Sequence, residues 1–285
     1  MSKISVIIPT YNRINDFQKT INSVIKYLDN ILEIIVVNDY PDSKIVMDNV
    51  TVINNKKNLG AGLSRNIGAE KANGDVLLFL DDDVILKNNI TNDLQSFVEE
   101  GKFSVISTLE YQGTVKNFNL NKYLSSRGAS KYNHGDVVKS NYLTTAFFAI
   151  HRNDFFKMGG FSSNFKGYGW EDTEFGLKLE KFNVLLKVIK SDSVHMHHKN
   201  CSEWSDQLIN SAGNFLELIR FYPSYQKRFR LEKFNNRFYK IILNRFLLNF
   251  ALLIDRITCS FYLEFLYRYI FICSIFIGVE KVKRG

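Results

Sequence analysis

Short runs of apolar residues recur along the first two thirds of the chain, each rich in β-branched or aromatic side chains. Runs of this length and composition are typical of strands buried on both faces of a parallel sheet. The first four are residues 3–8, 32–37, 50–53 and 76–80. The pattern is less regular further on, where we expect strands at residues 104–111, 144–151 and 184–189.

Amphipathic stretches separate these runs. Between the first two, apolar residues recur at spacings of three and four, the period of a helix with one buried face: Phe17, Ile21, Val24, Ile25 and Leu28. Further helices are expected at residues 60–74 and 88–100. Strands that alternate with helices predict an α/β fold with a mostly parallel central sheet, in which ligands bind at the carboxyl ends of the strands.

Polar residues follow three of these strands at the point where each strand ends. Thr10 and Tyr11 follow the first, Asn38 and Asp39 the second, and the consecutive aspartates 81–83 the fourth. Because the carboxyl ends of parallel strands share one edge of a sheet, the sequence predicts a binding site on that rim.

Two common phosphate-binding motifs are absent from this rim. No GxxxxGK[ST] follows any of the strands, and Gly60-x-Gly62 lacks the third glycine of the dinucleotide motif because Arg65 stands there. A nucleotidyltransferase would need a glycine-rich, lysine-bearing loop after the first strand, and "PTYNR" does not provide one. These observations disfavour P-loop, NAD-dependent and nucleotidyltransferase functions.

The basic residues are concentrated at the C-terminal end. The 285 residues carry a net charge of +8. From residue 220 onward there are 13 lysines and arginines but only four acids. The preceding body is nearly neutral, which argues against nucleic-acid binding and for a tail with a partner of its own. We therefore expect two parts, an α/β body at residues 1–220 and a helical tail at 221–285.

The cysteines are few, and their spacing does not suggest disulfide pairs. Cys201, Cys259 and Cys273 are an odd number without close spacing, and no basic start followed by an apolar run precedes Ile4. These features favour a reducing cytoplasmic location without disulfides.

Asp81, Asp82 and Asp83 carry the strongest chemical signal. An arbitrary run of three aspartates is often a solvated loop, but at the end of a buried strand their repulsion is costly unless a cation compensates it. Oxygen ligands favour Mg²⁺ or Mn²⁺, and the D-x-D-x-D-G pattern of a calcium loop is absent. Because side chains alternate along an extended segment, Asp81 and Asp83 should form the metal-binding pair while Asp82 points the other way.

Five segments together resemble the family 2 glycosyltransferases, which have the GT-A fold. In chain order they are "SVIIPTYNR", "IIVVNDYPDS", "NLGAGLSRNIG", "DVLLFLDDDV" and "GGFSSNFKGYGWEDTEFGLKL", spanning roughly residues 3–200. The resemblance implies an inverting enzyme that uses a nucleotide-diphosphate sugar and a divalent metal, Mn²⁺ or Mg²⁺. Uridine is the expected base of the donor.

The resemblance also assigns a nucleotide-binding set. In this family the D-x-D pair meets the nucleotide and its metal, the segment after the first strand lines the nucleotide pocket, and an aspartate after the second strand recognises the base. The set here is Pro9, Thr10, Tyr11, Arg13, Asn38, Asp39, Arg65, Asp81 and Asp82. The family commonly has two aspartates followed by Gly-Ser where this chain has Asn38, Asp39, Tyr40 and Pro41. Arg65 suits a diphosphate near a helix start, with an ordinary exposed arginine as the alternative.

The acceptor side is expected around "GYGWEDTEF". The aspartate of the ED pair is the general base in the resembling family, which assigns that role to Asp172; Trp170 and Glu171 would contact the acceptor. Acids in a first helical turn also arise from capping alone, and Trp170 could equally pack in a core.

Histidines near the end of the body offer a further metal ligand. Many GT-A enzymes complete the metal shell with a histidine on a late strand, which indicates His195, with His197 as the alternative. A zinc site from His195, His197, His198 and Cys201 is disfavoured because no second cysteine pair completes it.

The tail at residues 237–279 is aromatic and basic. Neither of its apolar runs reaches the roughly 18 to 20 residues that span a bilayer. Amphipathic helices with basic flanks fit a membrane surface, here the inner face of the cell membrane; the alternative is a hairpin packed on the body or on a second copy. We expect a glycosyltransferase that acts on a glycan or lipid-linked acceptor. The alternative is a non-catalytic sugar-nucleotide or glycan-binding protein of the same fold.

Overall fold

The computed structural model describes residues 2–114, 117–228, 236–258 and 261–284. Its strands are β1 Ile4–Thr10, β2 Ile31–Asn38, β3 Thr51–Asn54, β4 Val76–Leu80, β5 Val84–Ile85, β6 Phe103–Ser107, β7 Glu110–Gln112, β8 Val137–Val138, β9 Phe147–His151, β10 Leu185–Ile189 and β11 Val194–Met196. The helices that accompany these strands are α1 Ile14–Tyr27, α2 Ala61–Lys71, α3 Thr91–Glu99, α5 Arg152–Lys157 and α6 Glu171–Lys181, whereas α4 Phe118–Ser125 lies almost wholly in a separate helical unit.

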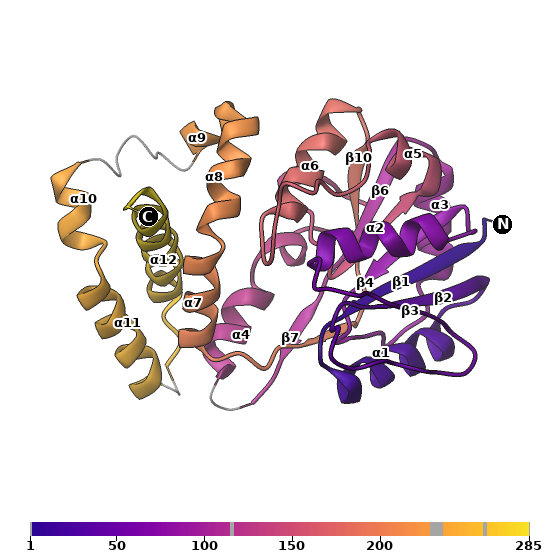
Figure 1. Ribbon diagram of the computed structural model, residues 1–285, viewed down its shortest axis with the longest axis horizontal. Coiled ribbons are helices and arrows are strands. Elements are labelled where there is room, and N and C mark those ends of the chain that lie inside the picture. The colour runs from indigo at the N-terminus through magenta and orange to yellow at the C-terminus, as the bar shows by residue number, and fades with distance from the viewer. Residues whose placement is uncertain (1, 115–116, 229–235, 259–260, 285) are drawn as a thin grey trace. The chain divides into compact units, whose positions relative to one another are not determined.

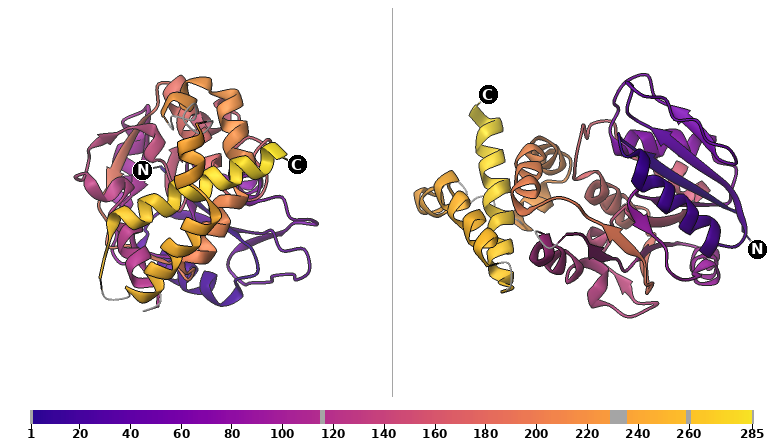
Figure 2. Two further views of the ribbon diagram at one scale, coloured as in Figure 1. Left: turned by 90° about the vertical axis from the view of Figure 1, so that its left-hand side faces the viewer. Right: turned by 90° about the horizontal axis from the view of Figure 1, so that it is seen from below.

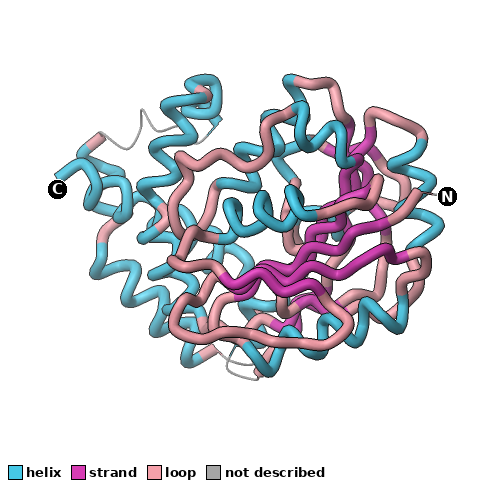
Figure 3. The backbone as a smooth tube through the Cα atoms, turned by 45° about the vertical axis from the view of Figure 1, so that its right-hand side comes forward, coloured by secondary structure: helices cyan, strands magenta, loops and turns pink. Residues whose placement is uncertain are grey.

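An eight-stranded sheet forms the centre of this part, in the order β3-β2-β1-β4-β9-β6-β10-β8 (Figures 1 and 3). Strands β1 to β4 are parallel, as are β6 and β10. The predicted α/β fold with a mostly parallel sheet is therefore confirmed. A small second sheet has the order β5-β11-β7.

Side chains of the central strands alternate between two apolar layers. Ile4, Val6 and Ile8 belong to one buried cluster, whereas Ile7 belongs to the other. This alternation explains why β1 is apolar at nearly every position, because both faces of the sheet are covered. Helix α1 packs Phe17, Ile21 and Val24 into the first cluster, whereas Ile25, expected on the same face, is 59% exposed. Ala69 of α2 lies in the second cluster.

Helix α2 approaches β1 closely at Gly68. A Cβ atom added there would lie 2.4 Å from Ile7 Cγ2, so a larger residue could not be accommodated without movement. At the start of the same helix Gly60 has φ +87°, a conformation that strongly favours glycine. These two glycines hold α2 against the strands whose ends carry the polar residues.

One strand prediction needs correction, and one strand has a direction that the sequence did not specify. Strand β9 pairs antiparallel with both β4 and β6 within the mostly parallel sheet. The apolar run at 104–111 is divided between β6 and β7, which belong to different sheets. Because β9 is antiparallel, its amino end lies beside the carboxyl end of β4, with Phe147 opposite Leu80.

The chain divides into two compact units. The first contains residues up to Tyr111, Ser125–Ser163 and Glu171–Met196; the second contains Gln112–Leu124, Asn164–Trp170 and the chain from His197 onward. The second unit therefore takes in residues well before 221, where the tail was expected to begin.

The second unit is helical, with its own apolar core. Its helices, besides α4, are α7 Cys201–Asn210, α8 Ala212–Phe221, α9 Pro223–Arg228, α10 Arg237–Ile242, α11 Arg245–Ile257 and α12 Glu264–Arg284. Helix α12 contacts α7, α8 and α11 (Figure 2). Its side chains fill much of the core. Within the described ranges, no helix combines the length and the apolar character needed to cross a membrane. Cys201 and Cys273 are free thiols, and Cys259 lies outside the described residues.

Candidate active site

The aspartates after β4 lie in a turn. The Val84 amide donates to the Asp81 carbonyl at 3.2 Å, so the segment is not extended as the sequence argument assumed. Asp82 accepts a hydrogen bond from Thr10 Oγ1 at 2.7 Å, and it shares the Arg13 guanidinium with Asp83. Burial raises the pKa of the Asp82 carboxyl to about 6, although the Thr10 bond opposes the shift.

Asp81, Asp83 and His195 form a cluster that could hold a metal ion. One ligand atom from each lies within 4.8 Å of the others. Strand β11 pairs with β5 so that His195 stands opposite Val84, which explains why its Nε2 lies 2.9 Å from Asp83 Oδ1. Both Mn²⁺ and Mg²⁺ prefer hard oxygen ligands such as these two carboxylates. The imidazole suits Mn²⁺ better, because Mg²⁺ accepts nitrogen ligands less readily.

Cationic neighbours keep Asp83 ionised. Burial alone would raise the pKa of its carboxyl, but the hydrogen bond and charge of His195, together with Arg13, lower it to about 2. The Arg13 guanidinium donates to Asp83 and, at 3.3 Å, to Asp82. A negatively charged Asp83 is the form that binds a cation.

Arg65 is buried between carboxylates, not exposed on its helix. It is 3% exposed, and its Nη2 donates to Asp81 Oδ1 at 2.6 Å. Its Nη1 lies 3.7 Å from Glu171 Oε1, and neither Nη1 nor Nε has a hydrogen-bond acceptor among the described residues. Buried hydrogen-bond donors are nearly always paired, so two without an acceptor indicate a missing ligand. These nitrogens are therefore suited to bind an additional anionic group.

Glu171 and Asp172 begin helix α6. Asp172 accepts hydrogen bonds from Thr145 through both carboxylate oxygens, at 2.7 Å from Oγ1 and 3.1 Å from the amide. Burial raises the pKa of Asp172, while Arg65 opposes the shift. Burial also raises the pKa of Glu171 to about 7, together with the charge of Asp172. Thr145 stands at the rim because it precedes the antiparallel strand β9.

The polar residues after β2 are engaged in their own loop. Asp39 accepts hydrogen bonds from the amides of Leu59 at 2.9 Å and Gly60 at 2.7 Å, and so fixes the segment that leads into α2. Asn38 Nδ2 donates to the Ser43 carbonyl at 2.6 Å and to Asn54 Oδ1 at 2.8 Å. Base recognition by Asn38 and Asp39 stays a prediction.

The remaining predicted site residues lie outside the cluster formed by Asp81, Asp83 and His195. Pro9 pairs with β2 inside the sheet, and Tyr11 is 48% exposed with its ring edge-on to Tyr40. Trp170 belongs to the second unit, where its Nε1 donates to Ser211 Oγ at 3.0 Å. His197 also belongs to that unit, with Nδ1 2.9 Å from Asn121 Oδ1, and it is not part of the metal-binding cluster.

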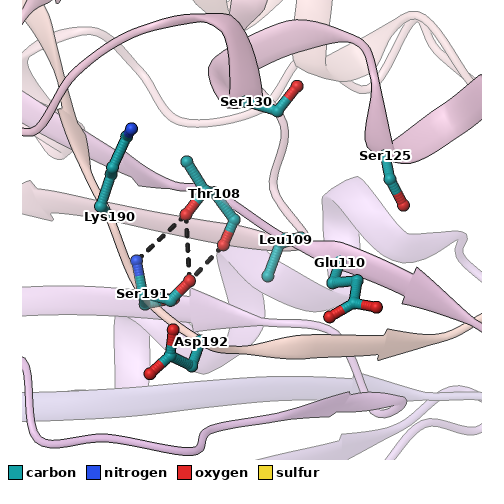
Figure 4. Close-up of a pocket in the computed structure, with 8 residues that line it drawn as sticks. All are labelled: Thr108, Leu109, Glu110, Ser125, Ser130, Lys190, Ser191 and Asp192. Carbon is teal, nitrogen blue, oxygen red and sulfur yellow. Dashed lines mark hydrogen bonds between the residues drawn. The ribbon is translucent and has the colours of Figure 1, made fainter. Parts of the chain in front are cut away.

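A separate cavity of about 350 Å³ lies beside Thr108 and Ser191 (Figure 4). Its polar groups bond to one another: the Ser191 amide donates to Thr108 Oγ1 at 3.0 Å, and Thr108 Oγ1 donates to the Ser191 carbonyl at 3.1 Å. No residue that the sequence predicts for the site lines this cavity. The chemically active groups are gathered at the strand ends instead.

Thr145 and Tyr111 were not predicted from the sequence. Thr145 orients Asp172, and the Tyr111 ring lies 4.7 Å from the His195 ring, centroid to centroid. Neither residue stands in a recognisable motif. Only the pairing of strands brings Thr145 to the rim and β11 beside β5.

Together, the mixed sheet and the acidic cluster at its strand ends define a GT-A-like α/β protein. Residues 5–165 match the family model described as glycosyl transferase family 2. The chain belongs to that family.

Similar proteins are known from bacteria. An uncharacterized glycosyltransferase of Haemophilus influenzae is 29% identical over 212 residues, which cover 67% of this chain and 63% of that protein. The chain thus spans less than two thirds of this relative's length. The GalNAc(5)-diNAcBac-PP-undecaprenol beta-1,3-glucosyltransferase of Campylobacter jejuni is 28% identical over 217 residues, covering 68% of this chain and 67% of that protein.

A solved structure supports the fold assignment. The crystal structure of GalNAc-T7 with UDP, GalNAc and Mn²⁺ has a TM-score of 0.55 and 18% identity, covering 70% of this chain and 44% of that one. At this identity the likeness establishes the GT-A-type fold.

Proposed function

We propose that this protein is an inverting glycosyltransferase that moves a sugar from a nucleotide-diphosphate sugar to an acceptor hydroxyl. The observation that carries the proposal is the arrangement around Arg65. This arginine bonds Asp81 of the metal-binding cluster on one side and faces Glu171, the neighbour of Asp172, on the other. Groups suited to a leaving diphosphate and to a base thus lie on one edge of one sheet.

Donor binding is assigned to the residues around Asp81. Asp81, Asp83 and His195 would hold Mn²⁺ or Mg²⁺, which when bound supplies positive charge to the diphosphate. The unused Nη1 and Nε donors of Arg65 suit a phosphate oxygen. Uridine is the proposed base, in keeping with the UDP in the similar GalNAc-T7 structure.

Asp172 is the proposed general base. Thr145 holds both of its oxygens, which fixes the carboxylate and leaves lone pairs to accept a proton from an acceptor hydroxyl. Its pKa, raised by burial, makes it a stronger base than a solvent-exposed aspartate. Attack from that side, opposite the departing nucleotide, inverts the anomeric carbon.

The proposed acceptor is a glycan, in particular one carried on a lipid. The name of the Campylobacter relative describes an undecaprenol-linked acceptor, and this chain shares 28% of its residues over the aligned length. An acceptor of that kind places the enzyme at a membrane, for which we propose the cytoplasmic face. Trp170 and Glu171 are the proposed acceptor contacts, and self-association is the alternative use of the tail.

The test is a transfer assay with purified protein, a panel of UDP-sugars and Mn²⁺. Asp172→Asn should bind UDP with Mn²⁺ as the wild type does in calorimetry, yet transfer sugar at least about 100-fold more slowly, because only the proton acceptor is lost. Asp93→Asn is the matched control, since that carboxylate is 44% exposed on α3.

Retained transfer by Asp172→Asn would remove this residue from the base role. Normal UDP binding without turnover by the wild-type protein, across the panel and with lipid-linked acceptors, would favour the non-catalytic binding protein.

A further inference from the structure

Helix α11 turns a row of large apolar side chains toward solvent. Phe246, Phe250, Leu253 and Ile257 are 78%, 56%, 49% and 72% exposed, and we call these four residues the α11 face. Their spacing of four, three and four residues places them on one stripe of the helix. Soluble surfaces rarely carry so continuous an apolar row, so the α11 face indicates a partner.

The opposite side of α11 is already packed. Leu248 and Ala251 are buried in the core of the helical unit, where α11 contacts α12. At about 100° per residue, these two positions lie on the far side of the helix from the α11 face. The helix is therefore apolar on two sides, and α12 covers one of them (Figure 2). Exposure of the other side is not explained by a need for contact with the core.

Neighbouring segments add to the exposed apolar surface. Phe238 and Ile241 of α10 are 60% and 66% exposed, and Phe261 and Phe265 after α11 are 66% and 68% exposed. Aromatic side chains are favoured at the boundary between lipid headgroups and acyl chains.

The charges on α11 fit an anionic partner. Arg245 and Arg256 flank the α11 face and are exposed. Asp255, the one acid of the helix, lies on the other side, where it accepts a hydrogen bond from Tyr267. The described residues from 236 onward include eight lysines and arginines but only three acids. Basic residues beside an apolar face are typical of helices that lie on anionic membranes.

We propose that the α11 face docks on the surface of a bilayer with anionic headgroups, with the helix lying in the interface. This inference rests on the proposed function, because a protein that acts on a lipid-linked acceptor must reach that acceptor at a membrane surface. A second copy of the chain fits less well, because a two-fold contact through the α11 face would bring the flanking arginines of the two copies toward one another, and like charges repel.

The experiment measures sedimentation of the full chain with vesicles, without donor or metal. The protein should bind vesicles of phosphatidylcholine with phosphatidylglycerol more tightly than pure phosphatidylcholine, and 0.5 M NaCl should weaken that binding because it screens the headgroups. Phe246→Ser with Phe250→Ser should lower the partition coefficient about tenfold or more. Phe118→Ser with Phe182→Ser, at exposed positions outside α11, should leave it unchanged.

Two results would overturn the proposal. Equal vesicle binding by the α11 double variant and the wild type would show that the α11 face is not the membrane-docking surface. A stable dimer in light scattering that the double variant converts to monomer, without vesicle binding by either, would assign the face to a second copy. Donor hydrolysis by each variant is measured separately, so loss of docking and failure of the proposed reaction are distinguishable.

Discussion

The two units depart from the usual distribution of residues in opposite ways. The first buries charges: Arg65, Asp82 and Asp83 are 3%, 7% and 6% exposed. The second exposes apolar side chains, of which Phe246 at 78% is the most extreme on α11. Charged residues are rarely buried unless paired, and exposed apolar rows usually mark an interface.

The difference shows that each unit is built for a different kind of partner. In the first unit the buried charges are compensated by pairing, and the remaining unpaired donors and the acidic cluster suit a small charged ligand. In the second, the exposed apolar side chains can be covered only by another large surface. Substitutions that reverse each departure should therefore have unequal consequences for stability: a large loss where a buried charge is removed and little change where an exposed apolar side chain is removed.

The largest effect on stability is expected at Arg65. Arg65→Met removes the cation from Asp81 and Glu171 and leaves buried carboxylates uncompensated, which should lower the free energy of unfolding by about 3 kcal/mol. Urea denaturation at pH 7 measures this. Arg220→Met, at a side chain 76% exposed, is the control and should change it by less than about 0.5 kcal/mol. Equal effects of the two variants would mean that the buried pairing contributes nothing.

The next effect concerns metal binding. With Mn²⁺ at about 100 times its dissociation constant, the wild type should gain about 2.7 kcal/mol of stability, since the ion binds only the folded cluster. Asp83→Asn should lose this gain, whereas Asp93→Asn should keep it. Thermal unfolding with Mn²⁺ and with EDTA provides the measurement. A gain that persists in Asp83→Asn would place the ion elsewhere.

A pH-dependent effect is expected at Glu171. Its folded-state pKa of about 7 lies above the usual glutamate value of 4.5, so the folded protein holds this proton more strongly than the unfolded chain does. Its contribution to stability is therefore present at low pH and is lost as pH rises toward 7. Glu171→Gln, which keeps a neutral side chain, should gain about 2 °C in melting temperature relative to wild type between pH 5 and pH 8. A constant difference across that range would contradict the raised pKa.

The smallest effect is expected on α11. Phe250→Ser should change the free energy of unfolding by less than about 0.5 kcal/mol, because the side chain is 56% exposed and its loss opens no cavity. Phe215→Ser, at a fully buried position of the same unit, should cost about 3 kcal/mol or more. Denaturation without lipid compares the two. A large loss at Phe250 would mean that the α11 face packs within the protein.

Much of the catalytic unit was predictable because its signals are local. The apolar runs that became β1, β2 and β4 are buried on both faces, and such runs are recognisable without any contact information. The polar residues that follow them had to share one rim once the strands were parallel. The turn at Asp81–Asp83 was missed, since the alternation expected of an extended segment does not describe it.

The alternation of strands and helices, the polar rim and the family motifs all depend on neighbouring residues, so they can be read from the amino-acid order. Strand pairing in the folded protein, in contrast, places β9 antiparallel beside β4 and brings Thr145 to Asp172. Tertiary packing also carries His195 on β11 to Asp83, and it covers one side of α11 with α12 and leaves the other exposed. These contacts join residues far apart in the chain, and they depend on strand order and helix packing, which no local pattern encodes.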